Sequence, residues 1–174
     1  MRRTLFCVAA ILSANMAWAQ AQPVVRTLDL VGLNGKNVGK ITLTEAAKGV
    51  ILRLEANGFP QGWHGIHFHE KGVCDANNKF KDAGGHVHAM TSVVHGLLNA
   101  NANDDGDLTN VYAGADGKIN AEIYSTLVSV YPGRERPALL DGDGASVIIH
   151  ANPDDYQSQP IGGAGDRIAC AVIK

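Results

Sequence analysis

The sequence has few of the features that mark helical, membrane-spanning or nucleic-acid-binding chains. No segment keeps a helical hydrophobic period, there is no internal repeat, and beyond residue 20 no apolar run is long enough to cross a bilayer. Lysine and arginine (15) do not outnumber aspartate and glutamate (17). A chain with this balance gives no support for nucleic-acid binding. Its 174 residues suffice for one domain with a hydrophobic core.

The N-terminus has the features of a secretory signal peptide. Two arginines follow Met1, the mostly apolar segment 4–16 is too short to span a bilayer, and Ala17-Trp18-Ala19 is an A-x-A cleavage signal. We predict a signal peptide over 1–19 and one domain over 20–174, with cleavage after Ala21 and a membrane anchor as the alternatives. Without the signal the chain has 13 basic and 17 acidic residues, a net charge of −4.

Cysteine is scarce, and signal removal leaves only Cys74 and Cys170 of the three. Two cysteines in an exported chain are expected to form a disulfide, with a pair of free buried thiols as the alternative. A bridge between positions 96 residues apart would contribute roughly 4 to 5 kcal/mol in the chain-entropy model, as an upper figure.

Short runs of β-forming residues, separated by Gly- and Asn-containing turns, predict an antiparallel sandwich or barrel. The expected extended segments are 26–31, 40–44, 50–55, 62–70, 108–113, 118–124, 126–131, 145–150 and 167–173. The segment 71–107 keeps neither the two-residue hydrophobic period of a strand nor the 3.6-residue period of a helix. A loop of this length inside a compact domain requires a functional reason.

The histidines of the chain indicate that the function of this loop is metal binding. His67 and His69 are two apart in an extended run, so their side chains leave the same face of a strand. Further donors follow along the chain: His86, His95, His150, Asp104, Asp107 and Asp154. Imidazole suits copper and zinc, so the pattern predicts a transition-metal site.

Four motifs resemble those of the copper,zinc superoxide dismutases. The stretch 62–70 resembles the copper-binding signature, 83–86 the segment with the bridging histidine, 106–108 the zinc aspartate segment, and 162–170 the C-terminal signature. Their order and spacing match over essentially the whole mature chain, and the signal peptide makes it similar to the bacterial periplasmic branch. The resemblance implies an eight-stranded antiparallel Greek-key β-barrel or sandwich with long metal-binding and electrostatic loops.

The resemblance also implies a role for each donor. The implied copper ligands are His67, His69, His86 and His150. The implied zinc ligands are His86, as the bridge, with His95 and Asp107. The remaining implied roles are Asp154 as the carboxylate linking ligands of the two metals, Arg167 beside copper, the Cys74–Cys170 bridge, and a structural role for His64.

Three positions depart from the family pattern. Asp104 stands where the family has a fourth zinc ligand, a histidine, and we expect its carboxylate to take that place. His88, two residues after His86, is an alternative ligand, although we favour an exposed loop histidine. Asp166 precedes Arg167 and either pairs with it, weakens the local attraction for anions, or points into solvent.

The implied activity is dismutation of superoxide by copper redox cycling, with His86 as the proton shuttle and Arg167 attracting the anion. A periplasmic copper carrier on the same fold is the alternative. A zinc hydrolase is disfavoured because no residue stands out as a general base. The expected substrate is superoxide, without nucleic-acid or membrane partners. The branch contains monomers and dimers, so a homodimer stays open.

Overall fold

The computed structural model describes residues 25–174, so the predicted signal peptide lies outside the described residues. Within them the chain forms nine β-strands and two short 3-10 helices. The elements are β1 (Val25–Gly32), β2 (Asn37–Ala46), β3 (Gly49–Ala56), β4 (Gly62–His64), β5 (Ile66–His69), η1 (Ala76–Asn78), η2 (Lys81–Ala83), β6 (Val111–Ala113), β7 (Ile119–Ser125), β8 (Ala145–His150) and β9 (Arg167–Ile173). Neither described helix has the length and apolar character of a membrane span.

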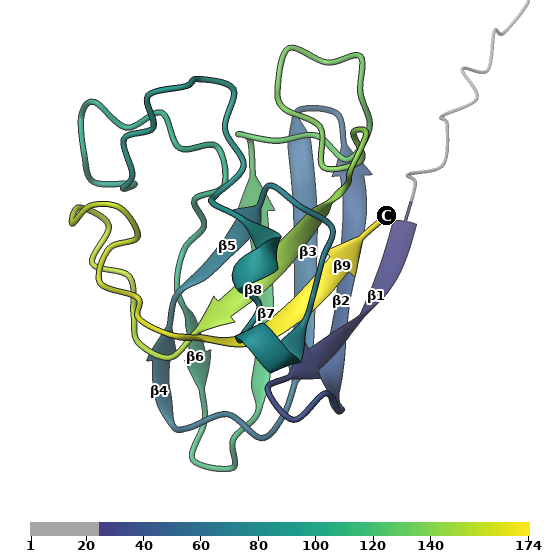
Figure 1. Ribbon diagram of the computed structural model, residues 1–174, viewed down its shortest axis with the longest axis vertical. Coiled ribbons are helices and arrows are strands. Elements are labelled where there is room, and N and C mark those ends of the chain that lie inside the picture. Colours follow the sequence, from purple (N-terminus) through teal and green to yellow (C-terminus); the bar gives the residue numbers. More distant parts are fainter. Residues whose placement is uncertain (1–24) are drawn as a thin grey trace, which may run out of the picture.

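The strands form an antiparallel barrel of Greek-key type. Seven of them pair in the order β5-β8-β9-β1-β2-β3-β7, and β4 pairs with β6. β4 continues into β5 through Gly65 alone, and β6 lies beside β7, which brings the two sheets together (Figure 1). With β4 and β5 counted as one interrupted strand, the predicted eight-stranded fold class is confirmed.

Some predicted segments are shorter than expected. The single strand predicted over 62–70 is divided at Gly65, and the one predicted over 108–113 is regular only in β6. The segment 126–131 is not a regular strand and forms one isolated bridge, from Ser129 to Ala138. The two short helices were not predicted; the side chain of Asp75 caps η1 by accepting from the Asn77 N–H.

β8 is buried on both faces, and the cover over its outer face determines where polar side chains are shielded from water. Val147 and Ile149 lie in the main core of the barrel, whereas Ile148 packs on the outer face against Phe80 and Cys170. Each such burial stabilises the fold by about 1.5–3 kcal/mol. The segment 71–107 therefore covers the outer face of β8, and polar groups on that face are removed from water.

Candidate metal centre

The outer face of β5 carries the first two histidines. The apolar residues of β5 lie in the barrel core, so His67 and His69, at alternate positions, lie on the opposite face. On the free edge of β5, isolated bridges join His67 to Asp107 and His69 to His86. Pairing with the edge of β5 thus positions two residues of the segment 71–107, His86 and Asp107, beside the histidines of the strand.

Four buried imidazoles converge on this face. His150 ends β8 and His86 comes from the loop. The ring centroid of His67 lies 4.2 Å from that of His86 and 4.9 Å from that of His150, and the His69 and His86 centroids are 4.9 Å apart. Each residue offers a ligand atom within 4.8 Å of the others.

One ring nitrogen of each imidazole is buried without a hydrogen-bond partner. These atoms are His67 Nδ1, His69 Nε2, His86 Nε2 and His150 Nε2. Burying an unpaired polar group costs about 1–3 kcal/mol. Four such atoms in one place are a donor set that fits a transition metal, and an all-nitrogen set suits copper.

The second nitrogen of each ring is engaged, which fixes the tautomer and the ring orientation. The contacts are His67 Nε2 with Asp154 Oδ2 at 2.9 Å, His69 Nδ1 with the Gly84 carbonyl at 3.0 Å, His86 Nδ1 with Asp104 Oδ2 at 2.7 Å, and His150 Nδ1 with the Gly165 carbonyl at 3.0 Å. The rings of His67, His69 and His150 donate from these nitrogens, so their other ring nitrogens carry free lone pairs in a cluster whose ligand atoms lie within 4.8 Å of one another.

Burial keeps three of these rings neutral. It lowers the pKa of His67, lowers that of His69 well below its usual value, and lowers the pKa of His150 to about 3, with the neighbouring histidines acting in the same direction. Metal ligation requires the neutral imidazole, so near pH 7 these three rings need to release few protons on binding, unlike His86.

A second cluster shares His86. His95 Nδ1 lies 2.7 Å from Asp107 Oδ1 and 3.3 Å from Asp104 Oδ2, and His86 Nδ1 lies 3.4 Å from Asp107 Oδ1. All four residues are buried, and their ligand atoms lie within 4.8 Å of one another. Two imidazoles and two carboxylates form a donor set that fits zinc.

The electrostatics of this cluster differ from those of the first. Burial disfavours charge, but the carboxylates of Asp104 and Asp107 outweigh it, so the pKa of His86 is raised and, with Asp154 adding to the effect, that of His95 is raised to about 11. The same contacts lower the pKa of Asp104 and Asp107 against the effect of burial. Without a metal, protons therefore take the place of the cation between these groups.

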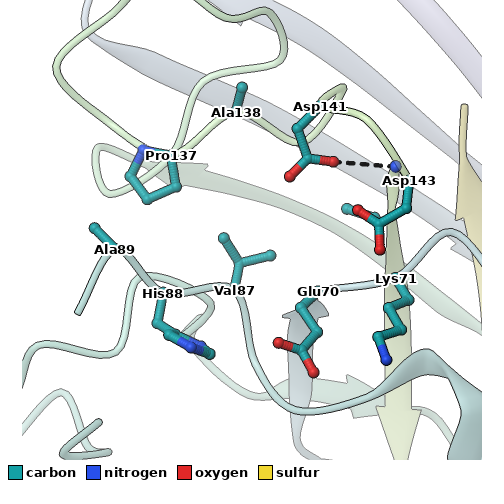
Figure 2. A pocket seen from close by; sticks show the side chains of 11 residues that line it. Glu70, Lys71, Val87, His88, Ala89, Pro137, Ala138, Asp141 and Asp143 are labelled. Carbon is teal, nitrogen blue, oxygen red and sulfur yellow. Dashed lines mark hydrogen bonds between the residues drawn. The ribbon is translucent and has the colours of Figure 1, made fainter. Parts of the chain in front are cut away.

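His88 lies outside both clusters. Its Nδ1 donates to the carbonyl oxygen of His86 at 2.7 Å, and it belongs to none of the candidate metal groups in the described chain. Figure 2 shows it on the wall of a cavity of about 410 Å³, which Glu70 and Asp141 also line. The geometry therefore favours Asp104 over His88 as the fourth member of the second cluster.

Asp154 connects the two clusters. Its Oδ2 contacts His67 Nε2 at 2.9 Å and its Oδ1 contacts His95 Nε2 at 3.1 Å. Sequence reasoning missed Asn110, whose carboxamide donates to the Asp154 carbonyl at 2.8 Å and accepts from its N–H at 2.9 Å. An asparagine beside a short strand gives no sequence signal for this role.

His64 lies away from the ligand set. Its Nδ1 contacts the His150 carbonyl at 2.8 Å and its Nε2 contacts the Pro60 carbonyl at 2.9 Å. Both ring nitrogens are thus engaged with the backbone, which agrees with a structural role next to a ligand strand.

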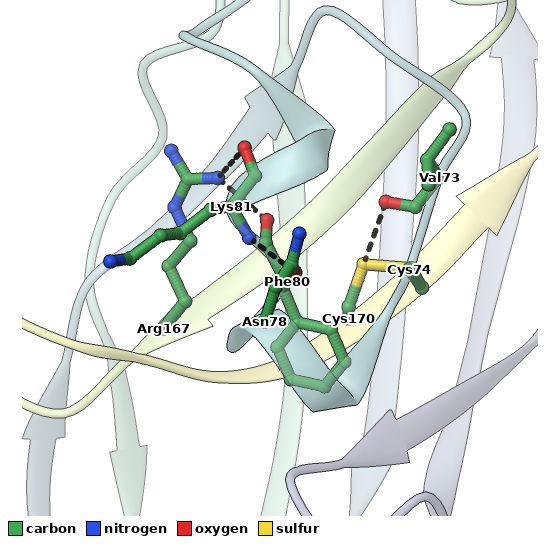
Figure 3. The surroundings of a disulfide bond; sticks show 7 residues. All are labelled: Val73, Cys74, Asn78, Phe80, Lys81, Arg167 and Cys170. Carbon is green, nitrogen blue, oxygen red and sulfur yellow. Dashed lines mark hydrogen bonds between the residues drawn. A yellow bond between two sulfur atoms is a disulfide. The ribbon is translucent and has the colours of Figure 1, made fainter.

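Arg167 begins β9 and is held by backbone carbonyls. One terminal nitrogen donates to Phe80 at 2.7 Å and to Lys81 at 3.3 Å, and the other donates to Gly84 at 2.6 Å. Figure 3 shows that the same segment is tied to β9 by the disulfide between Cys74 and Cys170, as predicted. The guanidinium is therefore held by carbonyl oxygens of this segment, and the disulfide in turn holds the segment against β9.

Asp166 does not pair with Arg167 in the structure. Its side chain is 77% exposed, and its nearest cation is Lys79, at 4.0 Å. Of the expected alternatives, the pairing with Arg167 is not seen, and the carboxylate lies in solvent, where its charge still acts against the local attraction for anions.

Comparison with known proteins agrees with this geometry. The family model described as copper/zinc superoxide dismutase matches residues 37–173. A protein of Caulobacter vibrioides named superoxide dismutase [Cu-Zn] is 59% identical over 141 residues, which cover 81% of this chain and 80% of that protein. One of Aquifex aeolicus with the same name, numbered 1, is 34% identical, covering 95% and 96%.

Solved structures extend the likeness to three dimensions. A superoxide dismutase-like protein from Bacillus subtilis superposes with a TM-score of 0.79 at 34% identity, covering 85% of this chain and 97% of that one. A Cu/Zn superoxide dismutase from Brucella abortus superposes with a TM-score of 0.69 at 26% identity, covering 87% and 100%. Motifs, fold and donor geometry thus agree, and the chain belongs to the copper/zinc superoxide dismutase family.

Proposed function

We propose that this chain is a periplasmic superoxide dismutase that holds copper through His67, His69, His86 and His150. Copper and zinc are the metals of its family. The observation that carries the assignment is the set of four clustered imidazoles, each with a buried ring nitrogen that lacks a hydrogen-bond partner. Zinc would be held by His86, His95, Asp104 and Asp107.

When bound, copper supplies the one-electron chemistry by which two superoxide anions and two protons become oxygen and hydrogen peroxide. The chain's own residues bring in the anion and the protons. Arg167 offers a positive charge that does not titrate away near neutral pH, fixed by the carbonyls of Phe80 and Gly84. Superoxide dismutases are themselves standard examples of such electrostatic steering, and Arg167 can serve it although the chain as a whole is acidic.

His86 is the group that can hold and deliver a proton. Its Nδ1 is held on the side of the second cluster, by Asp104 at 2.7 Å in the structure and by zinc once that ion is bound. The ring therefore keeps its place while Nε2, which has no protein partner, accepts or releases a proton toward the substrate side. A position between both clusters suits this role because the two ring nitrogens serve different neighbours.

The same proposal includes export: residues 1–19 act as a signal peptide and 20–174 form the mature enzyme. A copper carrier on this fold would not need Arg167, whose fixed guanidinium favours the enzyme. Homodimer formation is the open alternative to a monomer, and light scattering on the mature protein decides it.

The test is metal analysis together with a superoxide-consumption assay on the chain 20–174. The expected result is one copper per chain and rapid consumption, lost in His69→Ala together with copper. Arg167→Ala should keep copper but lose most of the rate. Copper bound by the wild-type chain without dismutation would refute the enzyme and favour the carrier.

A further inference from the structure

The segment that carries His95 depends on other loops for its backbone contacts. Val94 is paired with Asn103, through its N–H to Oδ1 at 2.7 Å and its carbonyl to the Asn103 N–H at 3.0 Å. The Leu98 N–H donates to the Tyr156 carbonyl at 3.1 Å. No regular strand includes this segment, so side chains and loops decide where the backbone of His95 lies.

Gln159 contacts the backbone of His95 at both of its polar groups. Its Oε1 accepts from the His95 N–H at 2.9 Å, and its Nε2 donates to the His95 carbonyl at 2.8 Å. The carboxamide thus pairs with His95 as a neighbouring peptide group would in a sheet. A third bond, from Nε2 to the Gln157 carbonyl at 3.0 Å, fixes the orientation of the amide.

The two segments also meet in direct backbone contact. Gly96 has a φ of +116°, and a Cβ atom there would lie 2.2 Å from the Tyr156 carbonyl oxygen. Only glycine permits this approach. The loop 151–166 therefore lies against the His95 segment at three points in succession, at Gly96, at Leu98 and through Gln159.

The loop 151–166 contacts His95 at two places, its imidazole ring and its main chain. Asp154 accepts from the ring at Nε2, 3.1 Å away, while Gln159 holds the main chain. With both ends fixed, Nδ1 is left 2.7 Å from Asp107 Oδ1 and 3.3 Å from Asp104 Oδ2, the direction that a metal ligand needs. Groups that orient a ligand in this way govern metal affinity although they do not touch the metal.

We propose that Gln159 is a positioning residue for the zinc site, which sets the place of His95 by a two-point hydrogen bond to its backbone. The proposal rests on the proposed role of His95 as a zinc ligand. Removing the carboxamide should weaken metal binding in the second cluster and alter its geometry, while leaving the copper histidines in place.

The experiment compares the full mature chain with Gln159→Leu, using Gln157→Leu as the matched control. Gln157 lies in the same loop, is exposed, and takes part in the bonds above only through its main chain. Each protein is loaded with copper, freed of zinc and titrated with Co²⁺, and the visible absorption of bound Co²⁺ reports both affinity and ligand geometry. Gln159→Leu should bind Co²⁺ about tenfold more weakly, with a changed spectrum, and Gln157→Leu should match the wild type.

An unchanged Co²⁺ affinity and spectrum in Gln159→Leu would overturn the proposal, as would an equal loss in Gln157→Leu. A wild-type chain that binds no Co²⁺ would instead refute the zinc assignment itself. If Gln159→Leu does not fold, Gln159→Glu gives the answer, because it keeps the length and one acceptor but loses the donor to the His95 carbonyl. Its spectrum must then differ from that of the wild type for the proposal to stand.

Discussion

Removal of the disulfide, in the double variant Cys74→Ala/Cys170→Ala, should damage both stability and activity. The bond joins residues 96 apart in sequence. The chain-entropy model assigns a loop of that length about 4.7 kcal/mol of stabilisation. In a domain of this size each kcal/mol corresponds to a shift in Tm of about 2–4 °C, so the variant should melt roughly 9–19 °C lower.

Activity should fall for a separate, geometric reason. Cys74 lies at the start of the segment whose carbonyls, at Phe80 and Gly84, hold Arg167. Freed from β9, this segment should hold the guanidinium less firmly and superoxide should be captured more slowly. The copper content should fall less than the rate, because no copper ligand lies between Cys74 and Gly84, although the Gly84 carbonyl also orients the His69 ring.

Calorimetry and superoxide consumption on the copper-loaded chain measure both effects. Wild-type protein treated with a thiol reductant is the control, since it keeps both sulfur atoms but lacks the bond, and it should behave as the double variant does. A drop in Tm below about 2 °C, far under the loop-entropy value, or an unchanged rate in the reduced protein, would refute the reasoning.

Three further predictions concern charges at and near the site. Asp104→Ala should lower zinc content more than His88→Ala does, and the reverse order in metal analysis would transfer the ligand role to His88. In the metal-free chain, burial lowers the pKa of His150 to about 3 and also lowers that of His69, so on these two groups the unfolded chain binds more protons below pH 6.5. Urea unfolding should therefore show a stability that falls between pH 6.5 and 5, by about 2 kcal/mol from His150 alone, and a flat profile would contradict this. Asp166→Asn should raise the rate modestly at low ionic strength, and the gain should vanish with added salt; a gain that persists in salt would exclude steering as its cause.

The gathering of the histidines was predictable because its signal lies in residue type, spacing and the family motifs. His67 and His69 show the strand period directly, whereas the roles of His86 and His150, and the choice of Asp104 as a fourth member of the second cluster, came from the resemblance to those motifs. Apart from Asp154, which the resemblance implied, the groups that orient these ligands were not predictable in the same way. The carbonyls of Gly84 and Gly165 are backbone atoms, which no residue type marks.

The carboxamide contacts were missed for a related reason. Gln159 and Asn110 are common loop residues, and only the fold shows that each pairs with a specific peptide group. The interruption at Gly65 was missed because the residues around it continue a β pattern. Its physical cause is tertiary: the Gly65 N–H donates to Asn152 at 2.8 Å and its carbonyl accepts from His150, also at 2.8 Å.

The pairing of β5 with β8 has a consequence for how the site forms during folding. The meander of β1, β2 and β3 consists of local contacts, whereas β5 and β8 are neighbours in the sheet but far apart in the chain. A topology rich in contacts of high sequence separation folds slowly. Three of the four copper histidines come from one continuous stretch of the chain, and only His150 depends on the pairing of β8 with β5. The complete set of four imidazoles is therefore a product of that long-range pairing and not of any single segment.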